Sequence, residues 1–111
     1  MNHRHGHRWQ IDLKILITFG GETQPYPACL TNLSFDGAAI RFSGLSLKQG
    51  GIVEVQLPGE TAPVQALTVH VGDEIAGLLW VERSPWVERM VGGLMSAQEV
   101  FSGYSNAVAL G

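Results

Sequence analysis

The chain has 111 residues, of which 45% are hydrophobic and 15% charged, and its formal net charge is −3. That length and composition fit one globular domain with its own core and exclude a chain that is disordered throughout. The acidic balance argues against a general nucleic-acid-binding protein, so no DNA or RNA partner is expected. No apolar run approaches the ~20 residues of a membrane-spanning helix and no signal peptide is evident, so we expect a cytoplasmic protein without membrane insertion.

Positive charge is concentrated at the start of the chain. Residues 1–11 contain Arg4, Arg8 and three histidines, and no acidic residue. Residues 1–10 therefore predict a flexible ligand-binding arm, in which Gly6 would let both guanidinium groups bend toward one ligand. Arginine binds a phosphate or the edge of a guanine bidentately. Taken alone, two arginines near a terminus describe a solvated arm, but an anionic partner would be expected to bind here.

Short strand-like runs separated by glycine, proline and polar residues follow the arm. Apolar residues alternate from Ile11 to Phe19, broken only by Leu16, as in a half-buried strand. Five further runs cover residues 26–33, 37–42, 52–57, 64–71 and 75–81. Strands at this spacing predict a mainly β fold, namely a six-stranded antiparallel β-barrel over residues 11–83, whose closure would remove exposed edges.

The pattern becomes helical after the last strand. Ser84 suits an N-cap and Pro85 suits the first helical position. Apolar residues then recur at helical spacing, at Trp86, Val87, Met90, Val91, Leu94 and Met95. We predict a C-terminal α-helix over residues 84–98 that packs its apolar face on the barrel instead of offering an exposed docking face. Residues 99–111 are expected to form a tail or a short helix.

No set of residues describes a catalytic site, so an enzyme is not expected. There is no phosphate-binding loop and no dinucleotide fingerprint. His70, in the run 64–71, is expected to have a structural role beside an inward-facing Val69. Cys29 is the only cysteine, which excludes an intrachain disulfide, and it is expected to be a small buried hydrophobe.

The alternating histidines of the arm, His3, His5 and His7, raise the question of a metal site. Together with the terminal amine they could offer nitrogen ligands to Cu(II) or Ni(II). Native metal ligands normally stand on rigid elements with supporting partners, whereas this leader is polar and flexible. No metal and no cofactor is therefore expected.

A polar turn, Asn32 to Gly37, separates the second and third runs. Asn32 and Ser34 are expected to face the same way and to hydrogen-bond a base or a phosphate. Gly37 permits a close approach that a β-carbon would block. Alone, this is an ordinary hairpin turn. Placed after the arginine arm, it predicts a site for a small, planar, doubly anionic molecule.

The two motifs together resemble the PilZ domain family. Arg4-x-x-x-Arg8 precedes the first strand, and Asn32-x-Ser34-x-x-Gly37 lies between the second and third. The likeness covers residues 4 to about 96, and Ala76–Trp80 resembles a late strand of the family. It implies a PilZ-like split barrel with a C-terminal helix. It also implies a bacterial second-messenger receptor that binds cyclic di-GMP and signals to an unidentified downstream protein.

The resemblance also implies roles for individual residues. Arg4 and Arg8 would bind guanine edges and phosphates. Asn32 and Ser34 would contact a guanine and its phosphate from the barrel surface, which Gly37 would keep open.

Two further residues are candidates for this site. Trp80 could be a stacking platform for a base, although a core position fits it equally well. His3 stands where many relatives carry another arginine, at a position associated with binding one ligand or a stacked pair. His3 therefore favours one ligand per chain.

Three other functions fit the sequence less well than the receptor. A PilZ-like protein-interaction adaptor that does not bind nucleotide is disfavoured because both motifs are retained. A small barrel for RNA or single-stranded DNA is opposed by the acidic balance. An enzyme would need a residue set that the sequence lacks.

Overall fold

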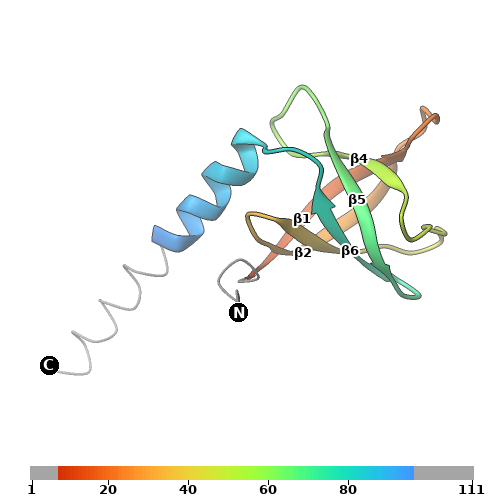
Figure 1. Ribbon diagram of the computed structural model, residues 1–111, viewed down its shortest axis with the longest axis horizontal. Coiled ribbons are helices and arrows are strands. Elements are labelled where there is room, and N and C mark those ends of the chain that lie inside the picture. The colour runs from red at the N-terminus through yellow and green to blue at the C-terminus, as the bar shows by residue number, and fades with distance from the viewer. Residues whose placement is uncertain (1–7, 97–111) are drawn as a thin grey trace, which may run out of the picture.

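The computed structural model describes residues 8–96, which form a closed antiparallel barrel followed by one helix (Figure 1). The strands are β1 (Trp9–Phe19), β2 (Tyr26–Leu33), β3 (Gly37–Arg41), β4 (Ile52–Gln56), β5 (Val64–Val71) and β6 (Ile75–Trp80). Their order around the barrel is β1-β2-β3-β6-β5-β4, and β4 pairs with β1 to close it. The predicted six-stranded barrel is confirmed.

Alternate side chains of each strand fill the barrel. Ile15 and Ile17 are buried, whereas Leu16 between them is 41% exposed, so the residue that breaks the apolar alternation of β1 faces outward. The interior is completed by large apolar side chains from the other strands and from the residue after β4, including Leu30, Leu33, Ile40, Val53, Val55, Leu57 and Leu78. Burial of these side chains is the main stabilising contribution to the fold.

β1 begins earlier than the sequence indicates. Trp9 pairs with Leu33 and Gln10 pairs with Asn32, so residues 9 and 10 belong to the barrel and not to the arm. The end of β2 provides these partners, and a partner strand is not visible in local sequence. Arg8 is consequently held directly beside the barrel wall.

β5 contains one extra residue relative to β6. Thr68 pairs with Leu78 and His70 pairs with Gly77, which leaves Val69 as the unpaired residue of a β-bulge. Because side chains alternate along a strand, an inserted residue reverses the faces beyond it. Thr68 is buried and His70 is exposed. The expected inward position of Val69 is therefore wrong, and His70 lies on the outer surface of β5.

β2 contains a matching irregularity. Leu30 pairs with Ile40 and Asn32 pairs with Ala39, so Thr31 is the extra residue against the regular strand β3. Leu30 is fully buried, and simple alternation would place Asn32 on the same inner face. The bulge instead turns Asn32 to the outer surface of the barrel.

The helix covers residues 85–96 of the described chain and begins as predicted. The backbone N–H of Val87 donates to Ser84 Oγ at 3.3 Å, and the N–H of Glu88 donates to the Ser84 carbonyl at 3.0 Å. Trp86 and Val91 are buried against the barrel, so the packed face is confirmed. Within residues 8–96, no helix is long and apolar enough to cross a membrane. The predicted helix end and the tail at 99–111 lie outside the described residues.

Replacing Ser84 with alanine is expected to lower the free energy of unfolding by about 1 kcal/mol, because the N-terminal N–H groups of the helix lose their cap. Thermal unfolding followed by circular dichroism should show a melting temperature lower by roughly 4–8 °C. Ser46→Ala, in an exposed loop, is the matched control and should leave the melting temperature unchanged. Equal melting temperatures for both variants would contradict the capping role.

Candidate functional site

A trough of about 400 Å³ lies on the outer face of the barrel, across β2, β3, β6 and β5. One row of cross-strand partners crosses it, from Asn32 through Ala39 and Gly77 to His70. Strands in a sheet are spaced by about 4.8 Å, so the two ends of this row are roughly 14 Å apart. Its middle carries almost no side chain, and a flat ring can approach the sheet there.

Arg8 and Asn32 meet at one end of the trough. The Nη1 of Arg8 donates a hydrogen bond to Oδ1 of Asn32 at 2.9 Å. An amide oxygen accepts this bond, so the guanidinium keeps its net positive charge beside the trough. The guanidinium and the amide also retain further N–H donors for a ligand. The first and second sequence motifs are thus joined at this point.

Ser34 does not reach the trough. Its side chain is 2% exposed, its Oγ accepts from the N–H of Gly37 at 3.1 Å, and its hydroxyl donates to the Gly37 carbonyl at 3.2 Å. The backbone N–H of Ser34 also donates to that carbonyl. Ser34 and Asn32 were expected to present their side chains together. The structure instead uses the hydroxyl to fix the turn.

Gly37 permits a close approach, but of another strand and not of a ligand. A β-carbon built on Gly37 would lie 1.9 Å from the carbonyl oxygen of Leu78 on β6. No side chain can occupy that position without moving backbone. The expectation that Gly37 keeps a ligand surface open is therefore corrected: this glycine allows β3 and β6 to pair.

Trp80 belongs to the inner face of β6. It follows Ala76 and Leu78 at two-residue intervals and packs against the hydrophobic core, while its backbone N–H donates to the Asp36 carbonyl at 2.9 Å. Its indole Nε1 is buried and has no hydrogen-bond partner in the described structure. Trp80 does not line the trough, so its core role is supported and its stacking role is not.

Arg4 and His3 lie outside the described residues, as do His5 and His7. The contribution of Arg4 to the site, the bearing of His3 on the number of ligands bound, and the expectation that these histidines hold no metal therefore stay predictions.

Two polar residues of the trough were not found from the sequence. Gln49 comes from the loop before β4, and His70 comes from β5. A glycine inside a strand pattern is one signal that could have indicated such a surface, because it marks a bulge or a close approach. Gly77 is that glycine, and it lies next to His70 on the neighbouring strand.

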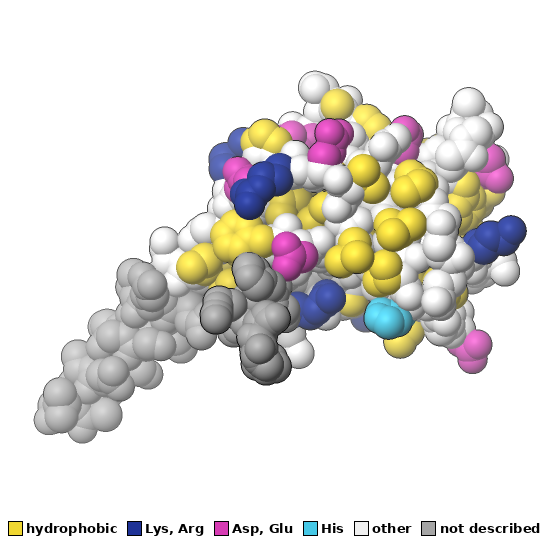
Figure 2. All heavy atoms as spheres, viewed as in Figure 1, with side chains coloured by type: hydrophobic (Ala, Val, Ile, Leu, Met, Phe, Trp, Pro, Cys, Tyr) yellow, Lys and Arg dark blue, Asp and Glu magenta, His cyan; other side chains and the backbone are white. Residues whose placement is uncertain are grey.

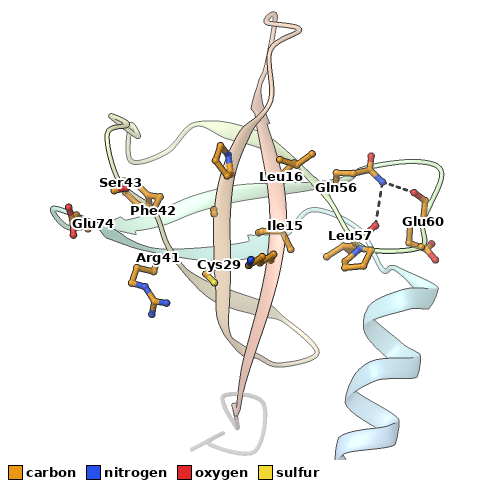
Figure 3. A pocket seen from close by; sticks show the side chains of 15 residues that line it. Ile15, Leu16, Cys29, Arg41, Phe42, Ser43, Gln56, Leu57, Glu60 and Glu74 are labelled. Atoms are coloured by element: carbon orange, nitrogen blue, oxygen red, sulfur yellow. Dashed lines mark hydrogen bonds between the residues drawn. The ribbon is translucent and has the colours of Figure 1, made fainter.

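A larger groove of about 930 Å³ lies over β1 and β2, bordered by the loops at 42–43 and 57–60 (Figure 3). Its rim carries the cations Lys14 and Arg41 and the anions Glu60 and Glu74. At the side of the 57–60 loop, Gln56 Nε2 donates to the carbonyl of Glu60. None of the motif residues within 8–96 lines this groove, so the smaller trough is the better candidate site.

Cys29 lines the larger groove and is half-buried, not the buried hydrophobe expected. Its thiol donates to the Asp12 carboxylate, with Sγ and Oδ1 separated by 3.3 Å. This hydrogen bond is the main cause that raises the pKa of the Cys29 thiol, because it stabilises the protonated form. A thiol with a raised pKa is a poorer nucleophile at neutral pH, and Cys29 does not describe a catalytic site.

One cross-strand row on the outer face of β4, β5 and β6 is apolar. Ile52, Leu67 and Leu79 are successive cross-strand partners, and Ile52 and Leu79 are 43% and 41% exposed. Figure 2 shows hydrophobic side chains gathered on the barrel face turned to the viewer, with charges of both signs around them. On β6 this apolar row comes two residues after Gly77, so it adjoins the trough.

Comparison with known proteins places the fold. No family model matches the sequence, and no curated protein matches it. The structure is similar to the PilZ domain of CeSA from a cellulose-synthesizing bacterium, with a TM-score of 0.65 and 21% identity, over 80% of this chain and 98% of that one. It is also similar to an uncharacterized Legionella protein, with a TM-score of 0.52 and 10% identity, over 86% of this chain and 98% of that one. The chain has a PilZ-like barrel fold.

Proposed function

We propose that this chain is a receptor domain, not an enzyme, that binds cyclic di-GMP in the trough beside Arg8 and Asn32. The observation that carries the proposal is the hydrogen bond between these two side chains, 2.9 Å from Nη1 to Oδ1. It unites the two motifs that resemble the PilZ family, on a barrel of PilZ-like fold. The acidic chain thereby presents a local cation where an anionic ligand would bind.

The trough offers the chemistry that a cyclic dinucleotide needs. Arg8 can bind a phosphate or the O6 and N7 atoms of a guanine with two parallel hydrogen bonds. The Asn32 amide can donate to the same groups. Ala39 and Gly77 leave the sheet open to a flat base, and the arm would add Arg4 from above.

The free energy of binding requires several of these contacts to act together. A Kd of ~1 μM corresponds to about 8 kcal/mol, in addition to an association cost of roughly 4–15 kcal/mol. A bidentate arginine–base pair contributes about 1–3 kcal/mol. A stacked base contributes about 1–3 kcal/mol. Both arginines, Asn32 and the open floor are therefore all needed in the proposed complex.

The proposed receptor signals through a partner protein. An arm that folds over the ligand creates a surface made of protein and nucleotide together. The exposed apolar row of Ile52, Leu67 and Leu79 adjoins that surface. In the alternative, an adaptor that does not bind nucleotide, the trough would stay empty at any concentration of cyclic di-GMP.

Calorimetric titration of cyclic di-GMP into the full chain separates these alternatives, with GMP and cyclic di-AMP as controls. We expect saturable binding of cyclic di-GMP, weakened about 100-fold when Arg4 and Arg8 are both replaced by alanine, since each bidentate contact is worth about tenfold or more. Arg83→Ala removes an exposed guanidinium that does not line the trough, and should bind like the wild type. No heat of binding to the wild-type chain would refute the receptor function.

A further inference from the structure

We propose that His70 is a further ligand-binding residue of the trough, at the end opposite Asn32. In this proposal it contacts a purine ring that lies over Gly77. Nothing in the two motifs points to this residue. The inference rests on the proposed function, since it concerns the same ligand. It adds a specificity-determining residue on a strand that neither motif reaches.

The position of His70 follows from the strand pairing. His70 pairs with Gly77, which pairs with Ala39, which pairs with Asn32. A β-carbon built on Gly77 would lie 3.4 Å from Cδ2 of His70 and 3.6 Å from Cγ2 of Val69. The imidazole therefore borders the gap that the glycine leaves. The gap is open because residue 77 has no side chain.

The imidazole is also free to bind. His70 is exposed, and neither of its ring nitrogens hydrogen-bonds another residue between 8 and 96. An imidazole can donate and accept hydrogen bonds at a base edge, and its ring can stack on a base. The exposed ring of His70 beside Gly77 and Ala39 therefore has the chemistry needed to bind a base.

The register shifts in β2 and β5 give a further reason to place His70 in the site. The extra residue Thr31 turns Asn32 outward, and the extra residue Val69 turns His70 outward. Asn32 and His70 are the two ends of the cross-strand row that crosses the trough. β3 and β6 between them pair without a shift in register. Bulges locally disrupt the ladder and are over-represented beside active sites, where they re-aim a side chain. The two bulges turn polar side chains toward the same trough. This arrangement points to one binding site with a polar residue at each end.

Calorimetry with cyclic di-GMP on His70→Ala and Gly77→Val tests the inference. We expect His70→Ala to weaken binding about tenfold, which corresponds to the loss of one stacked or hydrogen-bonded base contact. Gly77→Val should weaken binding at least as much, because its methyl groups fill the floor, while valine suits a strand and should preserve the barrel. Gln65→Ala, an exposed change on the same strand outside the trough, should bind like the wild type.

A direct readout comes from the imidazole signals of His70 in NMR spectra, assigned by their absence from His70→Ala. They should shift as cyclic di-GMP is added, which a purely structural residue would not require. The inference is wrong, and the receptor function stands, if Arg8→Ala weakens binding while His70→Ala binds normally and the His70 imidazole signals of the wild type do not shift on binding. If the wild type does not bind, both are wrong. Should Gly77→Val fail to fold, the exposed His70→Ala decides alone.

Discussion

Replacing Gly37 with alanine is expected to lower the free energy of unfolding by about 3 kcal/mol, the upper part of the range for overpacked interiors. The added β-carbon would lie 1.9 Å from the Leu78 carbonyl oxygen and 3.0 Å from its carbon. Both atoms are backbone, so no side-chain rotation relieves the contact. β3 and β6 must separate, which weakens the ladder between them and the turn that Ser34 fixes. The melting temperature should fall by roughly 10 °C or more.

Thermal and urea unfolding of Gly37→Ala measure this loss, and Gly93→Ala is the matched control. A β-carbon at Gly93 meets nothing within 4 Å, and the residue is in the helix. Alanine there should stabilise the chain by up to about 1 kcal/mol through helix propensity. The two glycine-to-alanine changes should thus have opposite signs. A stable Gly37→Ala that loses only ligand binding would mean that this glycine serves the ligand after all.

The strands could be predicted closely because their patterns are local. Period-two alternation and bounding glycines or prolines gave residues 26–33 and 64–71, and the structure has the same bounds for β2 and β5. The bulges could not be predicted, because an extra residue exists only relative to the neighbouring strand. For that reason alternation along β5 placed Val69 inside, whereas the structure buries Thr68 and pairs the exposed His70 with Gly77.

The roles of single residues in the second motif also depend on a neighbouring strand and could not be predicted from local sequence. Asn32, Ser34 and Gly37 have side chains that suit a ligand, and the sequence offers no reason to separate them. In the structure only Asn32 reaches the trough, while Ser34 and Gly37 build the turn. The difference depends on how closely β6 approaches, which is set by contacts some 40 residues along the chain. A motif can therefore combine one ligand contact with two residues that hold it in place.

The Arg8–Asn32 hydrogen bond leads to a prediction about how these residues act on binding. Arg8→Ala should weaken cyclic di-GMP binding about tenfold or more, through the loss of a bidentate contact. Asn32→Ala should weaken it by a similar factor, partly because the guanidinium loses the amide that orients it. Since each side chain works through the other, the double variant should be little weaker than Arg8→Ala alone. The coupling energy should be about 1 kcal/mol.

The cycle requires four calorimetric titrations: the wild type, both single variants and the double variant. Arg8→Lys adds a test of geometry, because lysine keeps the positive charge but lacks the planar fork. If orientation by Asn32 matters, Arg8→Lys should bind more weakly than the wild type and should be less sensitive than the wild type to loss of Asn32. Losses that simply add, with a double variant about 100-fold weaker, would show two independent contacts. The bond at the edge of the trough would then be a feature of the free protein that ligand binding breaks.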